Sequence, residues 1–254
     1  MAGLSSPVVT GHRSGLTGSP ALPAAALGAT PLPVAAPLRG LFLEAGLRRG
    51  SVVAVTPGAG ATALVLALLA PPLAAGSWAG IVGMRGLGLE AAAGLGVRLD
   101  RLALVPEPGT NWATVTAALL DALDVVVVVP PRRCRPIEVR RLVDRVRQRA
   151  AVLVIAGLER ADARAWSERP DVELVTEVIA WEGLGTGYGT LRRRQVAVSS
   201  AGRRGADRRL EARVWLPDPA GQLAGSASVV PGAEETPPRA LRVARRSSAL
   251  ARAG

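Results

Sequence analysis

Residues 53–70, VAVTPGAGATALVLALLA, predict a buried β-strand, a glycine-rich turn and an apolar helix in direct succession. The strand is built from valines, the turn contains Gly58 and Gly60, and leucines lie on nearly all sides of the helix. Phosphate-binding loops often have this order, because backbone amides at the start of the helix face the anion. A tight structural turn made of small residues has the same pattern, and we favour it over a working phosphate loop for the reasons below.

Strand-like and helix-like segments alternate outward from this stretch as far as Leu158. The segments that predict buried strands are apolar throughout: SWAGIVGM, LALV, DVVVVVPP and AVLVIAGL. The segments that predict helices have one apolar face: TNWATVTAALLDAL and PIEVRRLVDRVRQRA. This alternation predicts an α/β fold with a mostly parallel central sheet that is covered on both faces.

The pattern changes beyond residue 170, where strand-like segments follow one another with only turns between them. These segments are 171–184, 192–202 and 210–217. Because no helix fits between them, we expect antiparallel strands that extend one side of the sheet. The core domain is therefore predicted to span residues 36–216. Residues 1–35 and 217–254 are rich in Ala, Pro, Gly and Ser, and we expect a low-complexity N-terminal segment and a disordered basic tail.

The composition narrows the classes of function. The chain has 254 residues, one cysteine, one histidine and a formal net charge of +11. A single cysteine and a single histidine disfavour disulfides, metal centres of cysteine or histidine, and histidine-based catalysis. The charge favours nucleic acid or an acidic protein as partner, although an arginine-rich composition is also typical of a GC-rich genome. We expect a cytoplasmic, nucleoid-associated protein without a secretory signal or membrane span, because Pro71 and Pro72 interrupt the longest apolar run.

The glycine-rich turn departs from a working phosphate loop at its most important position. The pattern G-x-x-x-x-G-K-[ST] needs a lysine on the β- and γ-phosphates and a hydroxyl on Mg²⁺. Here Gly60, Ala61 and Thr62 occupy the G-K-[ST] positions, and Val55 stands where the first glycine belongs. Only Thr62 keeps the side chain that its role requires, so residues Gly58, Gly60, Ala61 and Thr62 are candidates for no more than a vestigial nucleotide loop.

The order of these segments resembles the RecA-type ATPase core. GLRRGSVVAVTPGAGATALVLALLA resembles the first strand, loop and helix of that core, and ELVTEVIAWEGLGTGYGTLRRRQVAVSSAGRR resembles its late strands. The resemblance covers roughly residues 36–216 and implies two further functional positions. The glutamate that activates water would fall at Met84, and the aspartate that positions Mg²⁺ would fall at Val129. With Ala61 at the lysine position, the resemblance implies a pseudo-ATPase that lacks catalytic residues, metal ligands and a nucleotide cofactor, and whose binding of ATP is weak or lost.

Within this superfamily the chain most resembles the shortened actinobacterial ImuA proteins, with the ending RVWLP at 213–217 and the Arg- and Ala-rich composition of that form. The resemblance implies a non-catalytic adaptor in damage-induced, error-prone translesion DNA synthesis. Its partners would be an ImuB-like Y-family polymerase homologue, an error-prone C-family DNA polymerase, RecA and DNA. Two alternatives stay open, namely a RecA-like DNA-dependent ATPase of recombination and a general basic nucleic-acid-binding protein.

Arginines and one tryptophan are the candidate contacts for nucleic acid or a protein partner. The arginines group after one predicted strand and along the late strands: Arg132, Arg133, Arg135, Arg192, Arg193, Arg194, Arg203 and Arg204. A solvated basic face would have the same pattern, and DNA and an acidic protein groove fit it equally well. Trp166 lies in a polar stretch and is a candidate exposed anchor, or else the cap of a loop, whereas Trp112 and Trp181 are expected in the core.

Overall fold

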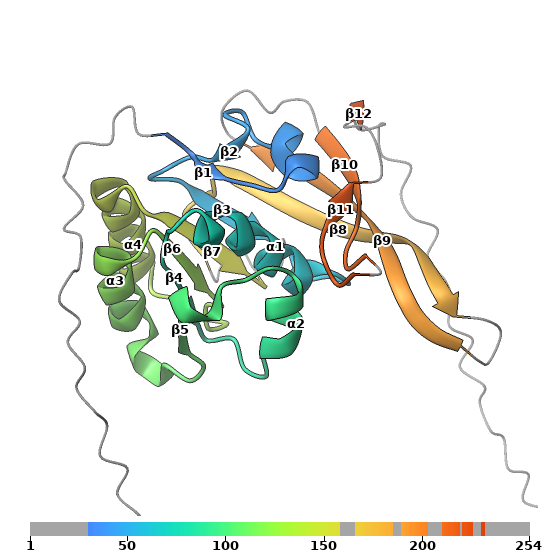
Figure 1. The fold of residues 1–254 in the computed structure, drawn as a ribbon. Coiled ribbons are helices and arrows are strands. Elements are labelled where there is room, and N and C mark those ends of the chain that lie inside the picture. Colours follow the sequence, from blue (N-terminus) through green and yellow to red (C-terminus); the bar gives the residue numbers. More distant parts are fainter. Residues whose placement is uncertain are drawn as a thin grey trace, which may run out of the picture.

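The fold is organised around a sheet of ten strands in which β3 (Val52–Val55) holds a central place (Figure 1). In the computed structural model, residues 30–157, 166–184, 189–202, 210–218, 220–225 and 230–231 are described. The strand order is β11-β10-β9-β8-β3-β7-β6-β4-β5, with β12 paired to β10 outside this path. The order places the parallel strands on one side of β3 and the late antiparallel strands on the other.

The parallel side of the sheet follows from its apolar strands. It contains β7 (Val152–Ala156), β6 (Val125–Val128), β4 (Ala79–Val82) and β5 (Leu102–Val105), each paired in parallel with its neighbour. Every residue of β3, β4, β6 and β7 is buried, as expected for strands covered on both faces. The predicted α/β fold with a mostly parallel central sheet is confirmed.

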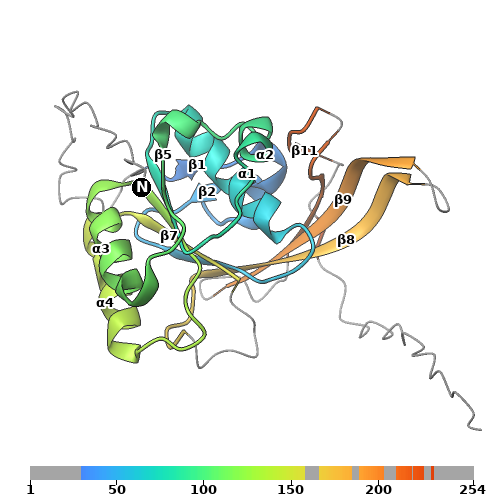
Figure 2. The same cartoon turned by 90° about the horizontal axis from the view of Figure 1, so that it is seen from below.

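Helices cover both faces of this parallel sheet (Figures 1 and 2). On one face lie α1 (Ala61–Ala74) and α2 (Leu89–Gly94), and on the other lie α3 (Trp112–Ala122) and α4 (Pro136–Arg149). Among the described residues there are also three short 3₁₀ turns, η1 (Ala36–Leu41), η2 (Leu99–Arg101) and η3 (Gly109–Asn111). Two apolar cores result, one between the sheet and α1, and one between the sheet and the α3–α4 pair.

The antiparallel side begins at β8 (Val172–Leu184), which is parallel to β3 and antiparallel to β9 (Gly189–Gly202). Both strands continue past the body of the molecule as a curved ribbon (Figure 2). Next come β10 (Leu210–Trp215), β11 (Ala224–Gly225) and β12 (Val230–Pro231), all in antiparallel pairs. The predicted antiparallel extension of the sheet is therefore present.

Structured residues extend slightly beyond the predicted core boundaries of 36 and 216. β1 (Leu32–Pro33) pairs with β2 (Gly46–Leu47), and Leu32 and Val34 are buried in the first core. At the other end β11 and β12 pair with β10, so this stretch of the expected tail belongs to the sheet. Within these two segments, residues 1–29, 219, 226–229 and 232–254 lie outside the described residues. Within the described part of the chain, no helix is both long and apolar enough to cross a membrane.

Candidate functional site

The candidate nucleotide loop is the turn that joins β3 to α1. At its start, the backbone N–H and the hydroxyl of Thr56 both donate to the carbonyl oxygen of Leu174 on β8, at 3.0 and 3.2 Å. At its end, the amide of Ala61 donates back to Gly58 and the amide of Leu64 donates to Gly60. Gly60 has φ of +96°, a conformation that favours glycine. The turn is thus tight and fixed to the neighbouring strand.

The N-terminus of α1, which follows the loop, has no side-chain cap within the described part of the chain. A helix leaves its first amides without partners inside the helix, and no side chain of the described residues caps α1. The exposed hydroxyl of Thr62 lies in the first turn of the helix. The first turn of α1 therefore offers the hydroxyl of Thr62 and carries no cation of its own.

A cavity of about 490 Å³ lies in front of this loop, between α1, α2, β9 and the turn that follows β10. Its walls are mostly apolar and include Leu66, Leu87, Ala91 and Leu95. Thr62 contributes a hydroxyl, and Arg194 is the one charged side chain among the described residues that line the cavity. A site of this kind offers an apolar wall, a few amides and a single positive charge.

Arg194 reaches the loop from β9. The guanidinium lies near the loop, because a Cβ added at Gly60 would sit 3.6 Å from one of its nitrogens. Its Nε donates to the carbonyl oxygen of Leu216 at 3.0 Å, and its guanidinium carbon is 5.4 Å from the centre of the Trp181 ring. Burial lowers the pKa of Arg194 from its ordinary value. Sequence reasoning placed Arg194 in a surface cluster and missed this approach, because a contact between a late strand and an early loop leaves no local pattern.

Met84 and Val129, the positions that the resemblance assigns to the glutamate and the aspartate, lie just beyond the ends of β4 and β6. Met84 and Val129 follow these strands, are half-buried and pack against the first core. The amide of Val129 donates to Val82 at 2.9 Å. A Cβ on the intervening Gly83 would approach the carbonyl oxygen of Val129 to 2.7 Å. Backbone atoms and apolar side chains therefore lie close together at the ends of β4 and β6.

The arginines predicted as contacts lie in two separate places, the connection from β6 to α4 and strand β9, apart from those outside the described residues. Arg132, Arg133 and Arg135 are exposed in the connection from β6 to α4. On β9, Arg192 is exposed, whereas Arg193 donates to Glu182 and lies 4.1 Å from the Trp215 ring centre. Successive residues of a strand point to opposite faces, so Arg193 and Arg194 do not form one patch. Arg203 and Arg204 lie outside the described residues.

Of the two alternatives for Trp166, burial excludes the exposed anchor, and the prediction that Trp181 lies in the core is wrong. Trp166 is 4% exposed and belongs to the core beneath α3 and α4, so it is no exposed anchor. Because its neighbours in sequence are polar, no local pattern indicated that this ring, just before β8, belongs to the second core. Trp181 is 46% exposed rather than in the core, because β8 continues beyond the body and its register shifts between Val178 and Ala180. Trp112 is buried as predicted.

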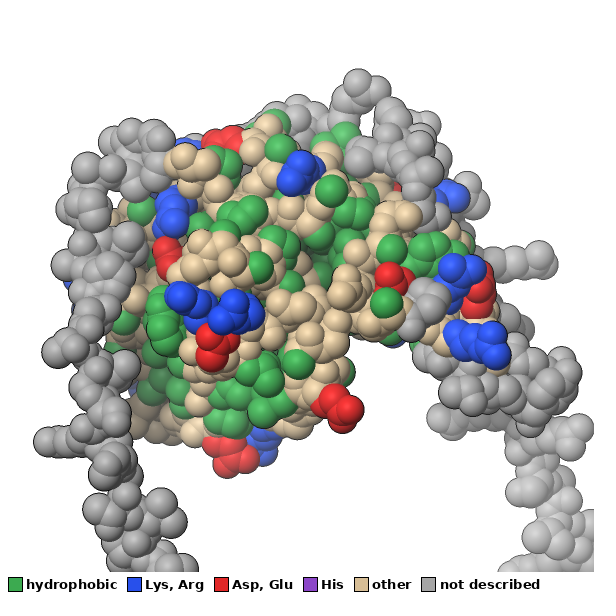
Figure 3. Space-filling model, in the orientation of Figure 1, with side chains coloured by type: hydrophobic (Ala, Val, Ile, Leu, Met, Phe, Trp, Pro, Cys, Tyr) green, Lys and Arg blue, Asp and Glu red, His purple; other side chains and the backbone are tan. Residues whose placement is uncertain are grey.

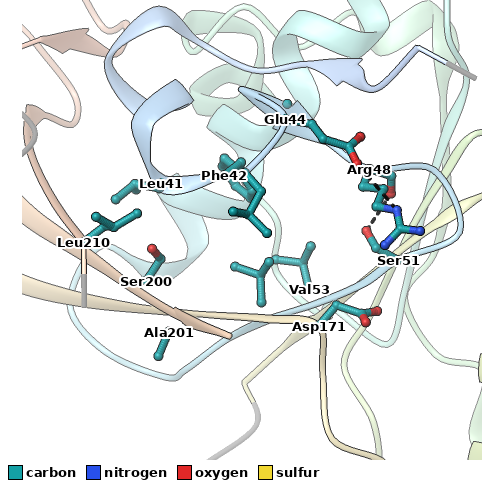
Figure 4. Close-up of a pocket in the computed structure, with 13 residues that line it drawn as sticks. Leu41, Phe42, Glu44, Arg48, Ser51, Val53, Asp171, Ser200, Ala201 and Leu210 are labelled. Carbon is teal, nitrogen blue, oxygen red and sulfur yellow. Dashed lines mark hydrogen bonds and ion pairs between the residues drawn. The ribbon is translucent and has the colours of Figure 1, made fainter. Parts of the chain in front are cut away.

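A second, smaller cavity of about 100 Å³ lies at the opposite end of β3 (Figure 4). Apolar side chains of Leu41, Phe42 and Val53 point into it. Its charged groups are engaged with neighbours: Asp171 accepts from the amide of Val52 at 2.9 Å, and Glu44 pairs with Arg48 at 3.6 Å. The hydroxyl of Ser51 donates to the carbonyl oxygen of Arg48. This lining holds the 3₁₀ turn on the sheet, and we assign no chemistry to it.

Comparisons with known proteins agree with this architecture. Residues 40–162 match the family model of the MT3502 N-terminal domain. The uncharacterized protein Rv3395c of Mycobacterium tuberculosis is 41% identical over 97 residues, which are 38% of this chain and 48% of the relative. The chain thus spans about half the length of that curated relative. The crystal structure of the RadB recombinase superposes with a TM-score of 0.54 at 16% identity, covering 74% of this chain and 96% of RadB. This likeness shows that the chain has the RecA-like fold.

Proposed function

We propose that the protein is a non-catalytic adaptor of the actinobacterial ImuA type in damage-induced, error-prone translesion DNA synthesis. It would bridge an ImuB-like Y-family polymerase homologue to an error-prone C-family polymerase and to RecA or DNA, in the cytoplasm at the nucleoid. The observation that carries the proposal is the state of the nucleotide loop. The chain has the RecA-like fold, and the resemblance to the RecA-type core assigns the positions of the lysine, glutamate and aspartate to Ala61, Met84 and Val129.

The lost contacts are large compared with the affinity that a nucleotide site needs. Each charge-assisted hydrogen bond contributes about 1.5–3 kcal/mol. Loss of the lysine and of the metal-positioning carboxylate therefore removes about 3–6 kcal/mol, which lowers affinity by roughly two to four orders of magnitude. Arg194 supplies one charge near the loop, but its guanidinium is already held by Leu216 and Trp181. We therefore propose that ATP binds weakly or not at all and is not hydrolysed.

Surface chemistry supports a role in contacting partners. The net charge of +11 attracts nucleic acid and acidic proteins. Arg132, Arg133 and Arg135 are exposed beside the C-terminal ends of the parallel strands, where α/β sheets commonly bind ligands. A protein that binds there without turnover would act by bringing partners together.

Copurification tests the proposal directly. The tagged full chain is expressed with an ImuB-like protein, and the eluate is assayed for that protein at moderate and high salt. We expect a stable complex that needs no added nucleotide, because the proposed role does not depend on ATP. Absence of the ImuB-like protein from the eluate, or a complex that forms only with ATP and Mg²⁺, would contradict the adaptor function.

A further inference from the structure

The distribution of ion pairs over the surface is uneven. Several arginines on the surface of the described residues have an acidic neighbour: Arg48 with Glu44, Arg85 with Glu107, Arg98 with Asp100, Arg145 and Arg149 with Asp121, Arg147 with Asp144, and Arg213 with Glu211. Figure 3 shows several of the blue side chains on one face lying beside red ones. These pairs leave little net charge in the areas that they occupy.

The exposed arginines that have no ion pair among the described residues are most concentrated in one short stretch. Arg132, Arg133, Arg135, Arg140 and Arg141 are all exposed, and none of them forms an ion pair within the described part of the chain. The first three lie in the connection before α4 and the other two in its first two turns. Two acidic residues lie close to them: Glu138 accepts from the backbone amide of Arg135, and Asp144 pairs with Arg147. Five arginines against the single charge of Glu138 still leave an excess of positive charge. The stretch therefore carries a concentrated and unbalanced positive charge.

An exposed apolar side chain lies within this charge. Ile137 is 54% exposed, although the buried face of α4 contains other aliphatic residues such as Val139 and Leu142. Positions three and four residues apart are neighbours on a helix surface, so Arg140 and Arg141 both adjoin Ile137. The stretch thus combines an apolar centre with a rim of arginines, and we call these six residues, Arg132, Arg133, Arg135, Ile137, Arg140 and Arg141, the α4 patch.

We propose that the α4 patch docks an acidic segment of a protein partner that carries an aliphatic or aromatic side chain among its carboxylates. The planar guanidinium groups can bind carboxylates through paired hydrogen bonds, and Ile137 gives the apolar side chain a surface to cover. A phosphate backbone would satisfy the arginines but would bury nothing against Ile137, so a peptide fits the patch better than a nucleic acid. The inference rests on the proposed adaptor function and names the chemistry of one of its partners.

A direct binding assay tests the α4 patch on the full chain. The probe is a fluorescein-labelled, glutamate-rich peptide with leucine at every third or fourth position, followed by anisotropy. A peptide of equal charge with serine in place of leucine, and a labelled DNA duplex, serve as comparisons. We expect the leucine peptide to bind most tightly. Ile137→Ser should weaken it about fivefold or more, and Arg140→Glu/Arg141→Glu about a hundredfold.

Arg39→Glu/Arg169→Glu is the matched control, since both arginines are exposed and without an ion pair among the described residues. It should change binding little if the effect belongs to the patch and not to the overall charge. Equal affinity for both peptides, tighter binding of DNA, or equal losses in the control would overturn the inference. Failure of the adaptor function looks different: the unaltered chain would then retain no ImuB-like protein, whatever the peptide assay shows.

Discussion

Gly83→Ala tests whether the ends of β4 and β6 are packed closely together, at the place where a RecA-type site would hold its carboxylates. Gly83 lies between β4 and Met84 with φ of +81°, which is strained for any residue with a side chain and costs about 1–2 kcal/mol. The added Cβ would also lie 2.7 Å from the carbonyl oxygen of Val129, a backbone atom that cannot rotate away. Such overpacking costs about 1–3 kcal/mol more. The free energy of unfolding should therefore fall by about 2–5 kcal/mol in total.

Gly86→Ala is the control that separates the two costs. Gly86 also has a positive φ, +67°, but a Cβ there would meet no atom within 4 Å. Gly86→Ala should therefore lower the free energy of unfolding only by the cost of a side chain at positive φ, about 1–2 kcal/mol. Urea unfolding followed by tryptophan fluorescence and by circular dichroism measures both variants against the unaltered chain. Equal destabilisation by the two substitutions would refute the reasoning, because it would mean that space remains between the ends of β4 and β6.

Three other predictions concern the loop, the tryptophans and the cysteine. Ala61→Lys should restore no phosphate release in an ATPase assay, because the positions of the two lost carboxylates stay apolar; turnover above background would be inconsistent with this. Trp166→Ala should lower the free energy of unfolding by about 3–5 kcal/mol in urea titrations, and Trp181→Ala by about 1 kcal/mol or less, since only the first ring is buried. Burial raises the pKa of Cys134 to about 11, so its alkylation rate should still rise about tenfold per pH unit between pH 8 and 10, whereas a plateau near pH 9 would contradict the shift.

The fold was largely predictable from sequence because its signals are local. Valine-rich runs predicted β3 and β6 as buried strands, and the apolar period of residues 136–149 predicted the face of α4 that packs on the sheet. The two-residue strands β11 and β12 escaped prediction, because two residues are too few to show an alternation. Their positions depend on free edge groups of β10, which only the folded sheet provides.

The candidate site was predictable only in part. The turn and its missing lysine are adjacent in sequence, so Gly60, Ala61 and Thr62 were found directly. The approach of Arg194 depends on the register of β9 against β8, which sets the face on which each side chain lies. The burial of Trp166 stayed open for a related reason, since the ring lies in the second core with residues distant in sequence, whereas its neighbours in sequence are polar.

Binding of a fluorescent ATP analogue to the full chain with Mg²⁺, read by anisotropy, tests the central claim of a non-catalytic RecA-like protein most directly. Phosphate release is measured on the same sample. We expect no saturable binding at micromolar concentrations and no phosphate release above background. Binding tighter than about 10 μM, a free energy near −7 kcal/mol, together with turnover would contradict it, since such affinity requires charge partners that Ala61 and Val129 do not provide.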